Sequence, residues 1–267
     1  MKNNYVLSSK SSEILRLNIQ SLLFEPFVTD ALNKSGIKKG MNCLDVGCGS
    51  GDVARLLSKM VGKTGSVVGI DVERKYLDYC KKVTTQKNVK FFQDNILDSQ
   101  LTDTFDIVFS RFMFVHLADK KQALRSMIKL TKKNGIVIIQ ELDNAPGSWL
   151  SYPKKDCVEK LRKTYTSLVK KMGGDPHAGR KLFKLFVDEG LQTKVECHSP
   201  CIVMNQTPFN ELGWRIAKSL KPEILSKKLM SESEFNQLFS DLKEMTKDDA
   251  CFVTYARFFN VIGKKRN

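Results

Sequence analysis

The sequence predicts an α/β fold in which helices cover both faces of a mostly parallel sheet. Apolar runs typical of strands alternate with segments whose apolar residues recur at helical spacing. The strand segments are continuously apolar, as expected of strands buried on both faces. A glycine-rich stretch follows the first strand and precedes a helix. Together these observations predict a Rossmann-like domain.

The first half of the chain accounts for five of the expected strands. Residues 10–36 show helical spacing and should form one or two amphipathic helices, because Pro26 is placed to begin a second one. Helical stripes near Val53, near Tyr76 and over 119–132 separate the strands that follow, and Asn134-Gly135 should form a turn. The five strands are residues 42–46, 66–71, 89–93, 105–110 and 136–141.

The second half is less regular but predicts two more strands, which makes seven. Helices are expected at 154–172 and 179–189, and strands at 193–204 and 251–262. We expect one domain over residues 1–267, because no flexible linker or repeat interrupts it. Its expected parts are a helical N-terminal cap (1–39), a core (40–143), a lid insertion (144–177) and a C-terminal half (178–267) with a helical insertion (207–248).

The charge of the chain is strongly positive, at +15 from 44 basic and 29 acidic residues. A nucleic-acid partner is therefore possible. The cations are mostly lysine, with 34 Lys against 10 Arg, and they are spread over the whole chain. Because phosphate recognition favours the bidentate fork of arginine, a solvated surface is the preferred interpretation.

Cysteine usage and hydropathy indicate a cytoplasmic protein. We expect a monomer or a homodimer, although no sequence feature specifies the oligomeric state. No apolar run approaches the roughly 18 residues that span a bilayer, and the N-terminal residues are polar. Cys197 and Cys201 flank His198, but a single C-x3-C pair predicts no metal site. Seven scattered cysteines fit free thiols in a reducing compartment.

The glycine-rich stretch predicts a cofactor loop. Gly47, Gly49 and Gly51 let the backbone turn tightly and approach a ligand closely. Asp71 lies twenty residues after Gly51, at the end of the second strand, where an acid can accept both hydroxyls of a ribose. The alternative for Asp71 is a cap for the helix that begins near Glu73.

The loop favours S-adenosylmethionine (SAM) over a dinucleotide. A dinucleotide site has a third glycine where this chain has Asp52, and a carboxylate beside a pyrophosphate would be repulsive. SAM has no phosphate and carries two cationic groups, so Asp45 and Asp52 are compatible with it. The alternative for Asp45 is a structural role, with its carboxylate on nearby backbone N–H groups.

Motif by motif, the chain resembles the class I SAM-dependent methyltransferases, in the broad group similar to ubiquinone and menaquinone C-methyltransferases. The match is specific over 41–143 and looser over 178–263. The matching segments are the SAM loop Leu44–Gly51, the ribose motif Val68–Asp71, the adenine motif Phe92–Ile96, the fourth strand Phe105–Ser110 and the fifth strand 134–139.

The resemblance implies a seven-stranded sheet whose last strand is antiparallel, with SAM as cofactor and S-adenosylhomocysteine as product. It implies that Asp94 meets the adenine amine, with Val72 and Ile96 on either side of the ring. Asn95 and Ser110 belong to the same expected cofactor site. Arg16 lies in an R-L-x-x-Q pattern seen in the cap of relatives. It is a candidate partner for the SAM carboxylate, or else forms a surface salt bridge.

The expected reaction transfers a methyl group to an O, N or C nucleophile of a small molecule, mainly through proximity and desolvation. His116 and Glu141 are candidate bases, although His116 could instead be a packed structural residue. Candidate substrate-binding residues are Tyr5, Asp143, Trp149 and Tyr152. The alternatives are an RNA or protein methyltransferase that uses the basic surface, and a SAM-binding module without catalysis.

Overall fold

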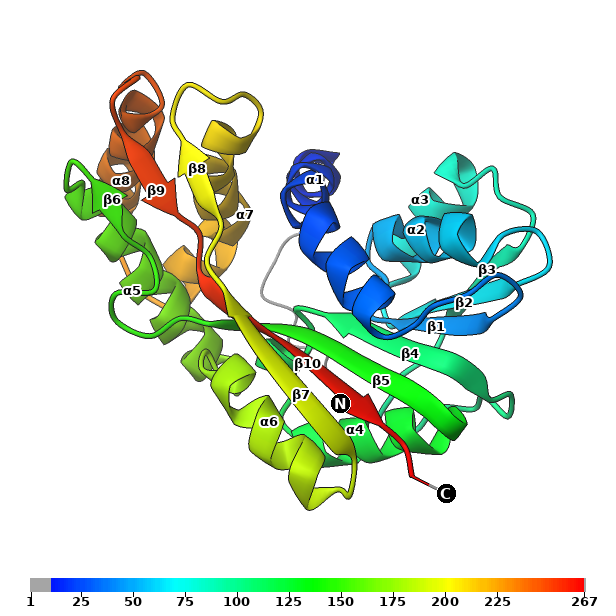
Figure 1. The fold of residues 1–267 in the computed structure, drawn as a ribbon. Helices are drawn as coiled ribbons and strands as arrows, with labels where there is room; N and C mark the ends of the chain where they lie inside the picture. The colour runs from blue at the N-terminus through cyan, green and yellow to red at the C-terminus, as the bar shows by residue number, and fades with distance from the viewer. Residues whose placement is uncertain (1–10, 267) are drawn as a thin grey trace.

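The computed structural model describes residues 11–266, and a seven-stranded sheet of order β3-β2-β1-β4-β5-β10-β7 runs through them (Figure 1). Its strands are β1 (Asn42–Val46), β2 (Ser66–Asp71), β3 (Val89–Gln93), β4 (Phe105–Arg111), β5 (Thr131–Asp143), β7 (Gln192–His198) and β10 (Arg257–Lys264). The last strand, β10, is antiparallel to both neighbours, and the β1–β5 pairs are all parallel. The predicted fold class is confirmed.

Helices cover both faces of this sheet (Figure 1). One face is covered by α1 (Ser11–Lys34), α2 (Asp52–Val61) and α3 (Arg74–Val83), and the other by α4 (Lys120–Lys129) and α6 (Ala178–Asp188). Neighbouring residues of a strand point to opposite faces, so Phe109 packs in the α1–α2 core and Val108 in the α4–α6 core. Both cores are apolar, which explains the continuous apolar runs in the sequence.

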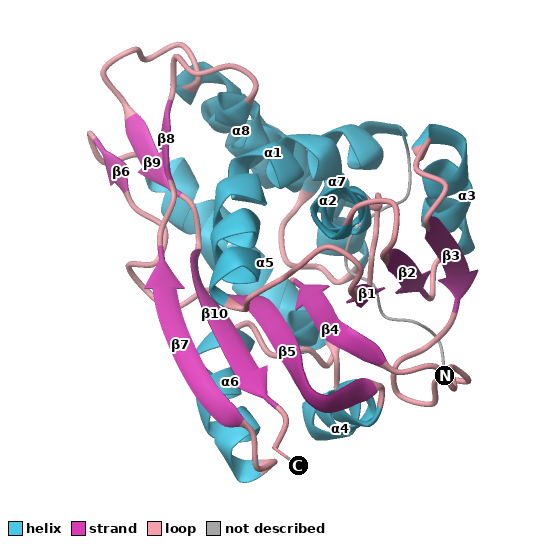
Figure 2. Cartoon of the chain, turned by 45° about the vertical axis from the view of Figure 1, so that its right-hand side comes forward, coloured by secondary structure: helices cyan, strands magenta, loops and turns pink. Residues whose placement is uncertain are grey.

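The remaining elements form a cover with its own apolar core, beside the carboxyl ends of the parallel strands (Figure 2). They are α5 (Asp156–Lys171), α7 (Leu212–Ser226), α8 (Glu232–Met245), the 3₁₀ turn η2 (Phe209–Glu211) and the sheet of β6 (Ser151–Tyr152), β9 (Phe252–Thr254) and β8 (Cys201–Val203). The 3₁₀ turn η1 (Phe114–His116) follows β4 at the same edge. Phe24 of α1 and Phe258 of β10 join this cover to the main sheet.

The three-stranded sheet was not predicted, because each of the two last expected strands divides in two. The segment 193–204 breaks at Pro200, which has no N–H for a ladder. The segment 251–262 breaks at Tyr255, whose N–H donates to the Pro200 carbonyl at 2.7 Å. Each segment therefore contributes one strand to the main sheet and one to the cover.

Of the two alternatives for residues 10–36, one helix or two, the structure has one, because α1 is continuous through Pro26. One local prediction differs from the structure. Asn134-Gly135 does not separate α4 from a strand but lies inside β5, where the register with β4 shifts. Asn134 has φ 59°, and a Cβ on Gly135 would lie 2.8 Å from Thr131 Cγ2. The turn chemistry was correctly predicted, but it produces a bulge.

Within residues 11–266, no helix is long and apolar enough to cross a bilayer. The same part of the chain holds no group of three His, Cys, Asp or Glu side chains placed for a metal ion.

Candidate functional site

A cavity of about 220 Å³ lies at the carboxyl ends of β1, β2 and β4, where open α/β sheets bind their ligands. Its walls come from the glycine-rich loop, from the ends of β2 and β3, from the segment after β4, and from α1 and the cover. The predicted cofactor residues on the wall are Arg16, Asp45, Gly47, Gly49, Asp71, Val72, Asp94, Asn95 and Ile96.

The loop itself adopts the backbone that the glycines permit. Gly47 and Gly49 have φ values of 71° and 51°, in the left-handed region. A Cβ on Gly47 would lie 2.9 Å from Met113 Sδ, whereas a Cβ on Gly49 would meet no atom within 4 Å. Gly51 is not on the cavity wall, because it packs against Cys80, whose Sγ would lie 2.8 Å from an added Cβ. Gly51 thus lets the start of α2 pack closely against Cys80.

Asp71 lies between the loop and the start of α3. Its Oδ2 accepts a hydrogen bond from the Gly49 N–H, and its Oδ1 accepts one from the Glu73 N–H, both at 2.9 Å. Burial raises the pKa of Asp71, and the two backbone donors oppose that shift. The carboxylate therefore fixes the loop and also faces the cavity, so the structural and cofactor interpretations are compatible.

Asp45 is the most unusual group on the wall. It is 2% exposed, and among the described residues no donor reaches its Oδ2. Burial raises its pKa to about 7, although Arg111 and a hydrogen bond from the Ala54 backbone oppose the shift. Ser110 is also buried with an unpartnered hydroxyl, but it lies behind the wall rather than on it.

Val72 and Ile96, which follow β2 and β3, supply apolar parts of the cavity wall. The carboxylate of Asp94 accepts hydrogen bonds from Asn95 N at 2.8 Å and Ser99 Oγ at 2.5 Å. A carboxylate has lone pairs for further donors, so Asp94 can still accept one from a ligand. The arrangement suits a flat ring that carries an amino group.

The end of the cavity under the cover is lined by aromatic rings. Trp149 lies here as predicted, stacked on Tyr255 with the ring centroids 5.7 Å apart. His116 is also on the wall, and burial lowers its pKa to about 4, with help from the charge of Arg16. Sequence reasoning missed most of this wall, which includes Gln20, Arg111, Phe112, Tyr165, Ile216 and Tyr255.

Two predicted residues of β5 are not on the cavity wall. Leu142 lines the cavity, so its neighbours Glu141 and Asp143 point to the other side of the strand. Glu141 is fully buried and accepts hydrogen bonds from the N–H groups of Val115 and Leu142, at 2.9 and 2.7 Å. Burial raises its pKa to about 7. It holds η1, which carries His116, and does not reach the cavity itself.

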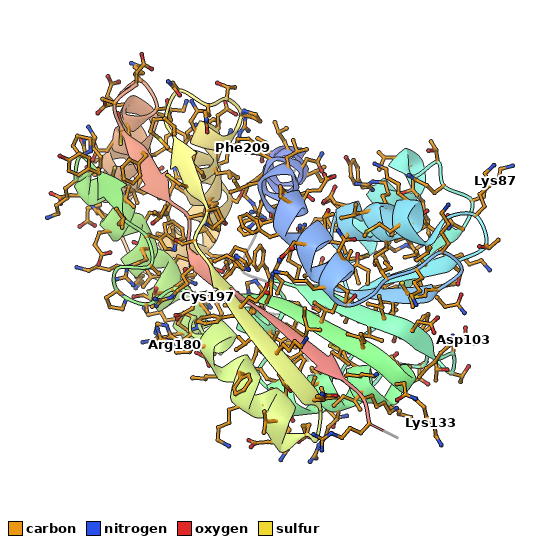
Figure 3. All side chains as sticks on the ribbon, viewed as in Figure 1. Lys87, Asp103, Lys133, Arg180, Cys197 and Phe209 are labelled. Carbon is orange, nitrogen blue, oxygen red and sulfur yellow. The ribbon has the colours of Figure 1, made fainter. Side chains whose placement is uncertain are left out.

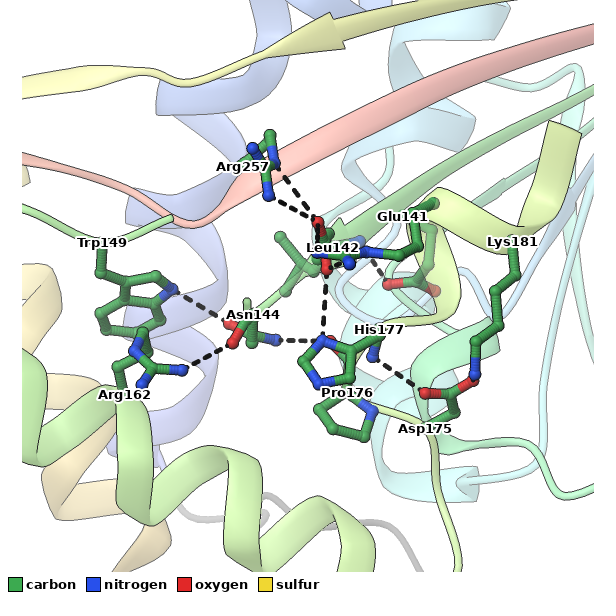
Figure 4. A network of polar contacts seen from close by, with 12 residues as sticks. Glu141, Leu142, Asn144, Trp149, Arg162, Asp175, Pro176, His177, Lys181 and Arg257 are labelled. Atoms are coloured by element: carbon green, nitrogen blue, oxygen red, sulfur yellow. Dashed lines mark hydrogen bonds and ion pairs between the residues drawn. The ribbon is translucent and has the colours of Figure 1, made fainter. Parts of the chain in front are cut away.

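Asp143 is buried and binds a set of partly exposed basic side chains, of which Figure 4 labels Arg257 and His177. Arg180 and Arg257 each donate to its carboxylate, at 2.7 and 2.9 Å for the shorter contacts, and His177 lies 3.2 Å away. Burial alone would raise the pKa of Asp143, but the two guanidinium groups outweigh that effect and lower it. Our substrate-binding prediction for Asp143 does not agree with this position.

A neighbouring part of the polar network in Figure 4 positions residues of the cavity wall. Trp149 Nε1 donates to Asn144 Oδ1 at 3.0 Å, and Arg162 of α5 donates to the Asn144 carbonyl at 2.8 Å (Figure 4). The end of β5 therefore positions both the tryptophan and the cover helix. Tyr152, also predicted to bind substrate, is 68% exposed and lies off the wall, against Phe252.

Arg16 lies on the wall, but its guanidinium already has a counter-ion. It donates to both carboxylate oxygens of Glu13, at 2.9 and 2.7 Å, and to Gln20 Oε1 at 2.7 Å. The Arg16 and Glu13 side chains are 3% and 0% exposed, so this is a buried ion pair and not a surface one. Tyr5, the remaining predicted substrate residue, lies outside the described residues.

Comparison with known proteins agrees with this geometry. A family model described as "Methyltransferase domain" matches residues 37–189, more than half of the chain. The chain belongs to this methyltransferase family. A demethylmenaquinone methyltransferase from Staphylococcus aureus is 38% identical over 108 residues, which is 40% of this chain and 45% of the relative. The chain thus matches less than half the length of that curated relative.

Solved structures share the fold. The YcgJ protein of Bacillus subtilis superposes with a TM-score of 0.59 at 15% identity, covering 90% of this chain and 98% of that one. Phosphoethanolamine N-methyltransferase 2 of Haemonchus contortus gives 0.59 at 19% identity, covering 93% of this chain and 56% of that one. The predicted assignment to the class I SAM-dependent methyltransferases is confirmed.

The wall of this methyltransferase fits its cofactor SAM at both ends. Asp45 Oδ2, which has no partner among the described residues, can face a cationic ligand once the carboxyl ionises, and the space in front of Gly49 is open. We expect Asp71 to face the ribose of bound SAM, and Val72 with Ile96 to flank its adenine, since all three line the cavity. When bound, SAM supplies a methyl group on a cationic sulfur, and the chain supplies the binding and orientation.

Replacing Asp45 by asparagine should change how the stability of the ligand-free enzyme depends on pH. The folded state holds a proton on Asp45 up to about pH 7, whereas an unfolded Asp ionises near pH 4. The buried carboxylate therefore costs stability as the pH rises from about 4 to 7, by on the order of 3 kcal/mol. Asp45→Asn should gain stability relative to wild type at pH 8 compared with pH 5, measured by urea unfolding. If the free energies of unfolding of Asp45→Asn and the wild type differ by the same amount at both pH values, the prediction is wrong.

Proposed function

We propose that this SAM-dependent methyltransferase acts on a small molecule that carries an apolar or aromatic ring. The observation that supports the proposal is the aromatic end of the cavity. Trp149, Tyr165 and Tyr255 come from three separate segments of the cover, and each is less than 8% exposed. Buried aromatic walls favour a compact apolar ligand, because they gain by excluding water from it.

The same walls favour the reaction. Methyl transfer from SAM is an in-line displacement, which benefits from a held geometry and a dry site. Phe112 and Leu142 add further apolar side chains to the lining of the cavity. His116 is neutral at physiological pH because its pKa is lowered to about 4, so its ring is a hydrogen-bonding group and not a cation.

The basic surface supports a polymer substrate less well. Lysines are spread over well-separated parts of the molecule, as the labelled Lys87 and Lys133 illustrate (Figure 3). A nucleic-acid site normally gathers its cations on one face. The Staphylococcus aureus relative is named for demethylmenaquinone, which is a small-molecule acceptor and agrees with the proposed class.

The deciding experiment incubates the enzyme with methyl-labelled SAM and a cell extract, which is then separated into organic-soluble, RNA and protein fractions. Label should enter the organic-soluble fraction. Trp149→Ala should lose at least about tenfold of that labelling while it keeps SAM affinity, because it opens the wall. Tyr152→Ala is the matched control, since this exposed aromatic residue of the same cover should have no effect. Label confined to RNA or protein would overturn the proposal.

A further inference from the structure

Two arginines of this methyltransferase line the cavity, and they differ in how their charge is balanced. Arg16 pairs with both oxygens of the buried Glu13 and also donates to Gln20. Ser219 of α7 donates to the same Glu13 carboxylate at 2.6 Å. The charge of Arg16 is therefore neutralised inside α1 before any ligand binds.

Arg111, at the end of β4, has no such partner. Among residues 11–266 no carboxylate forms an ion pair with it, and its one hydrogen bond is a long one, from Nη2 to Ser21 Oγ at 3.3 Å. Arg111 is half-buried on the cavity wall, with its guanidinium carbon 5.9 Å from the centre of the Phe112 ring. This burial lowers its pKa, while the charges of Asp52 and Asp45 oppose that effect. A desolvated cation without a counter-ion is costly, so a site of this kind gains when an anion arrives.

Asp45 provides the opposite charge on the same wall. Its carboxylate is 2% exposed, and Oδ2 has no partner among the described residues. Asp45 and Arg111 act on each other electrostatically but do not form an ion pair. Gly47, whose backbone gives close access, lies two residues beyond Asp45. The wall thus presents two incompletely compensated charges of opposite sign beside the loop.

We propose that Arg111, and not Arg16, binds the carboxylate of the amino acid end of SAM, with Asp45 facing the ammonium group. A ligand that carries both charges compensates both residues at once, which an inorganic anion or a simple amine cannot do. A guanidinium also pairs with a carboxylate through two parallel N–H donors. Arg16 is then a structural residue that ties α1 to the cover.

The test measures binding and does not depend on the methyl acceptor. Isothermal titration calorimetry compares S-adenosylhomocysteine with S-adenosyl-3-thiopropylamine, which lacks only the carboxylate. The wild-type enzyme should prefer S-adenosylhomocysteine by about 10- to 100-fold, the value of one charged hydrogen-bonded pair. Arg111→Met should reduce this preference to about twofold or less, and Arg111→Lys should restore part of it. The preference is the ratio of two dissociation constants measured on the same variant. An unfolded fraction weakens the apparent binding of both ligands equally, so it cannot by itself reduce this ratio.

The matched control removes the other arginine together with its counter-ion. The double variant Glu13→Leu, Arg16→Met leaves no unpaired charge and should keep the wild-type preference. A second ligand, S-adenosyl-4-thiobutyrate, lacks only the amine, and discrimination against it should depend on Asp45 and be lost in Asp45→Asn. An unchanged preference in Arg111→Met, or its loss in the double variant, would overturn the assignment.

Discussion

Replacing Asp71 by alanine is expected to raise the dissociation constant for SAM by about 100-fold or more. The carboxylate orders the loop through the Gly49 N–H and the start of α3 through the Glu73 N–H. It also lines the cavity, and we expect it to accept both ribose hydroxyls of SAM, where each charge-assisted hydrogen bond contributes about 1.5–3 kcal/mol. Two such bonds correspond to at least the stated loss in affinity. Isothermal titration calorimetry with SAM measures it directly.

The same change should remove most of the thermal stabilisation that SAM gives to the enzyme, because stabilisation by a ligand follows its affinity. Asp71→Asn keeps acceptor oxygen but loses the charge, so it should lie between alanine and wild type. Asp78, an exposed acid on α3, supplies the control, and Asp78→Ala should bind SAM as wild type does. Stabilisation of Asp71→Ala equal to that of the wild type would refute the ribose assignment.

The cofactor half of the site could be predicted because its signals are local. Each residue lies at or just beyond the carboxyl end of a strand, and the carboxyl ends of neighbouring parallel strands meet at one edge. Asp45, Asp71 and Asp94 therefore reach one cavity, although they are widely separated in the sequence. The same logic predicted the first five strands.

The aromatic end of the cavity, where we propose that the substrate binds, could not be predicted in this way, because it depends on contacts between distant segments. Tyr255 reaches the wall from the break between β9 and β10, and its hydroxyl accepts a hydrogen bond from Gln20 of α1 at 2.9 Å. Strand β6 pairs with β9 across about 100 intervening residues, and no local pattern indicates that pairing. A cavity wall assembled from such contacts has no sequence motif.

The positions of Glu141 and Asp143 on β5, and the pairing of Arg16 with Glu13 on α1, follow from patterns that the sequence did contain. Strand alternation separates Glu141 and Asp143 from Leu142, so only one of these two sets can face the cavity. Glu13 precedes Arg16 by three positions, a spacing that places both side chains on one helix face. The sequence did not show that this pair is buried. Ser219 of the cover, which contacts Glu13, lies 206 residues later in the chain.

Loss of Glu13 should therefore destabilise the enzyme more than any exposed charge on the same helix. Glu13→Ala leaves the Arg16 guanidinium buried and removes the acceptor of Ser219, which joins α1 to α7. Breaking one side of a buried ion pair costs about 3–5 kcal/mol in the free energy of unfolding. Urea unfolding at neutral pH measures this change.

Removing both partners of the Glu13–Arg16 ion pair should cost far less stability than removing only one of them. A double variant, Glu13→Leu with Arg16→Met, exchanges the buried charges for apolar groups of similar volume and should recover most of the lost stability. Glu244 and Lys247 have the same spacing on the surface of the cover, with side chains 71% and 72% exposed, so Glu244→Ala should cause no measurable change. If the double variant is no more stable than Glu13→Ala, the cost lies in lost packing against α7 and not in an uncompensated charge. Recovery would instead show that the Arg16 charge serves its ion pair with Glu13, which leaves Arg111 as the cavity cation available to a ligand.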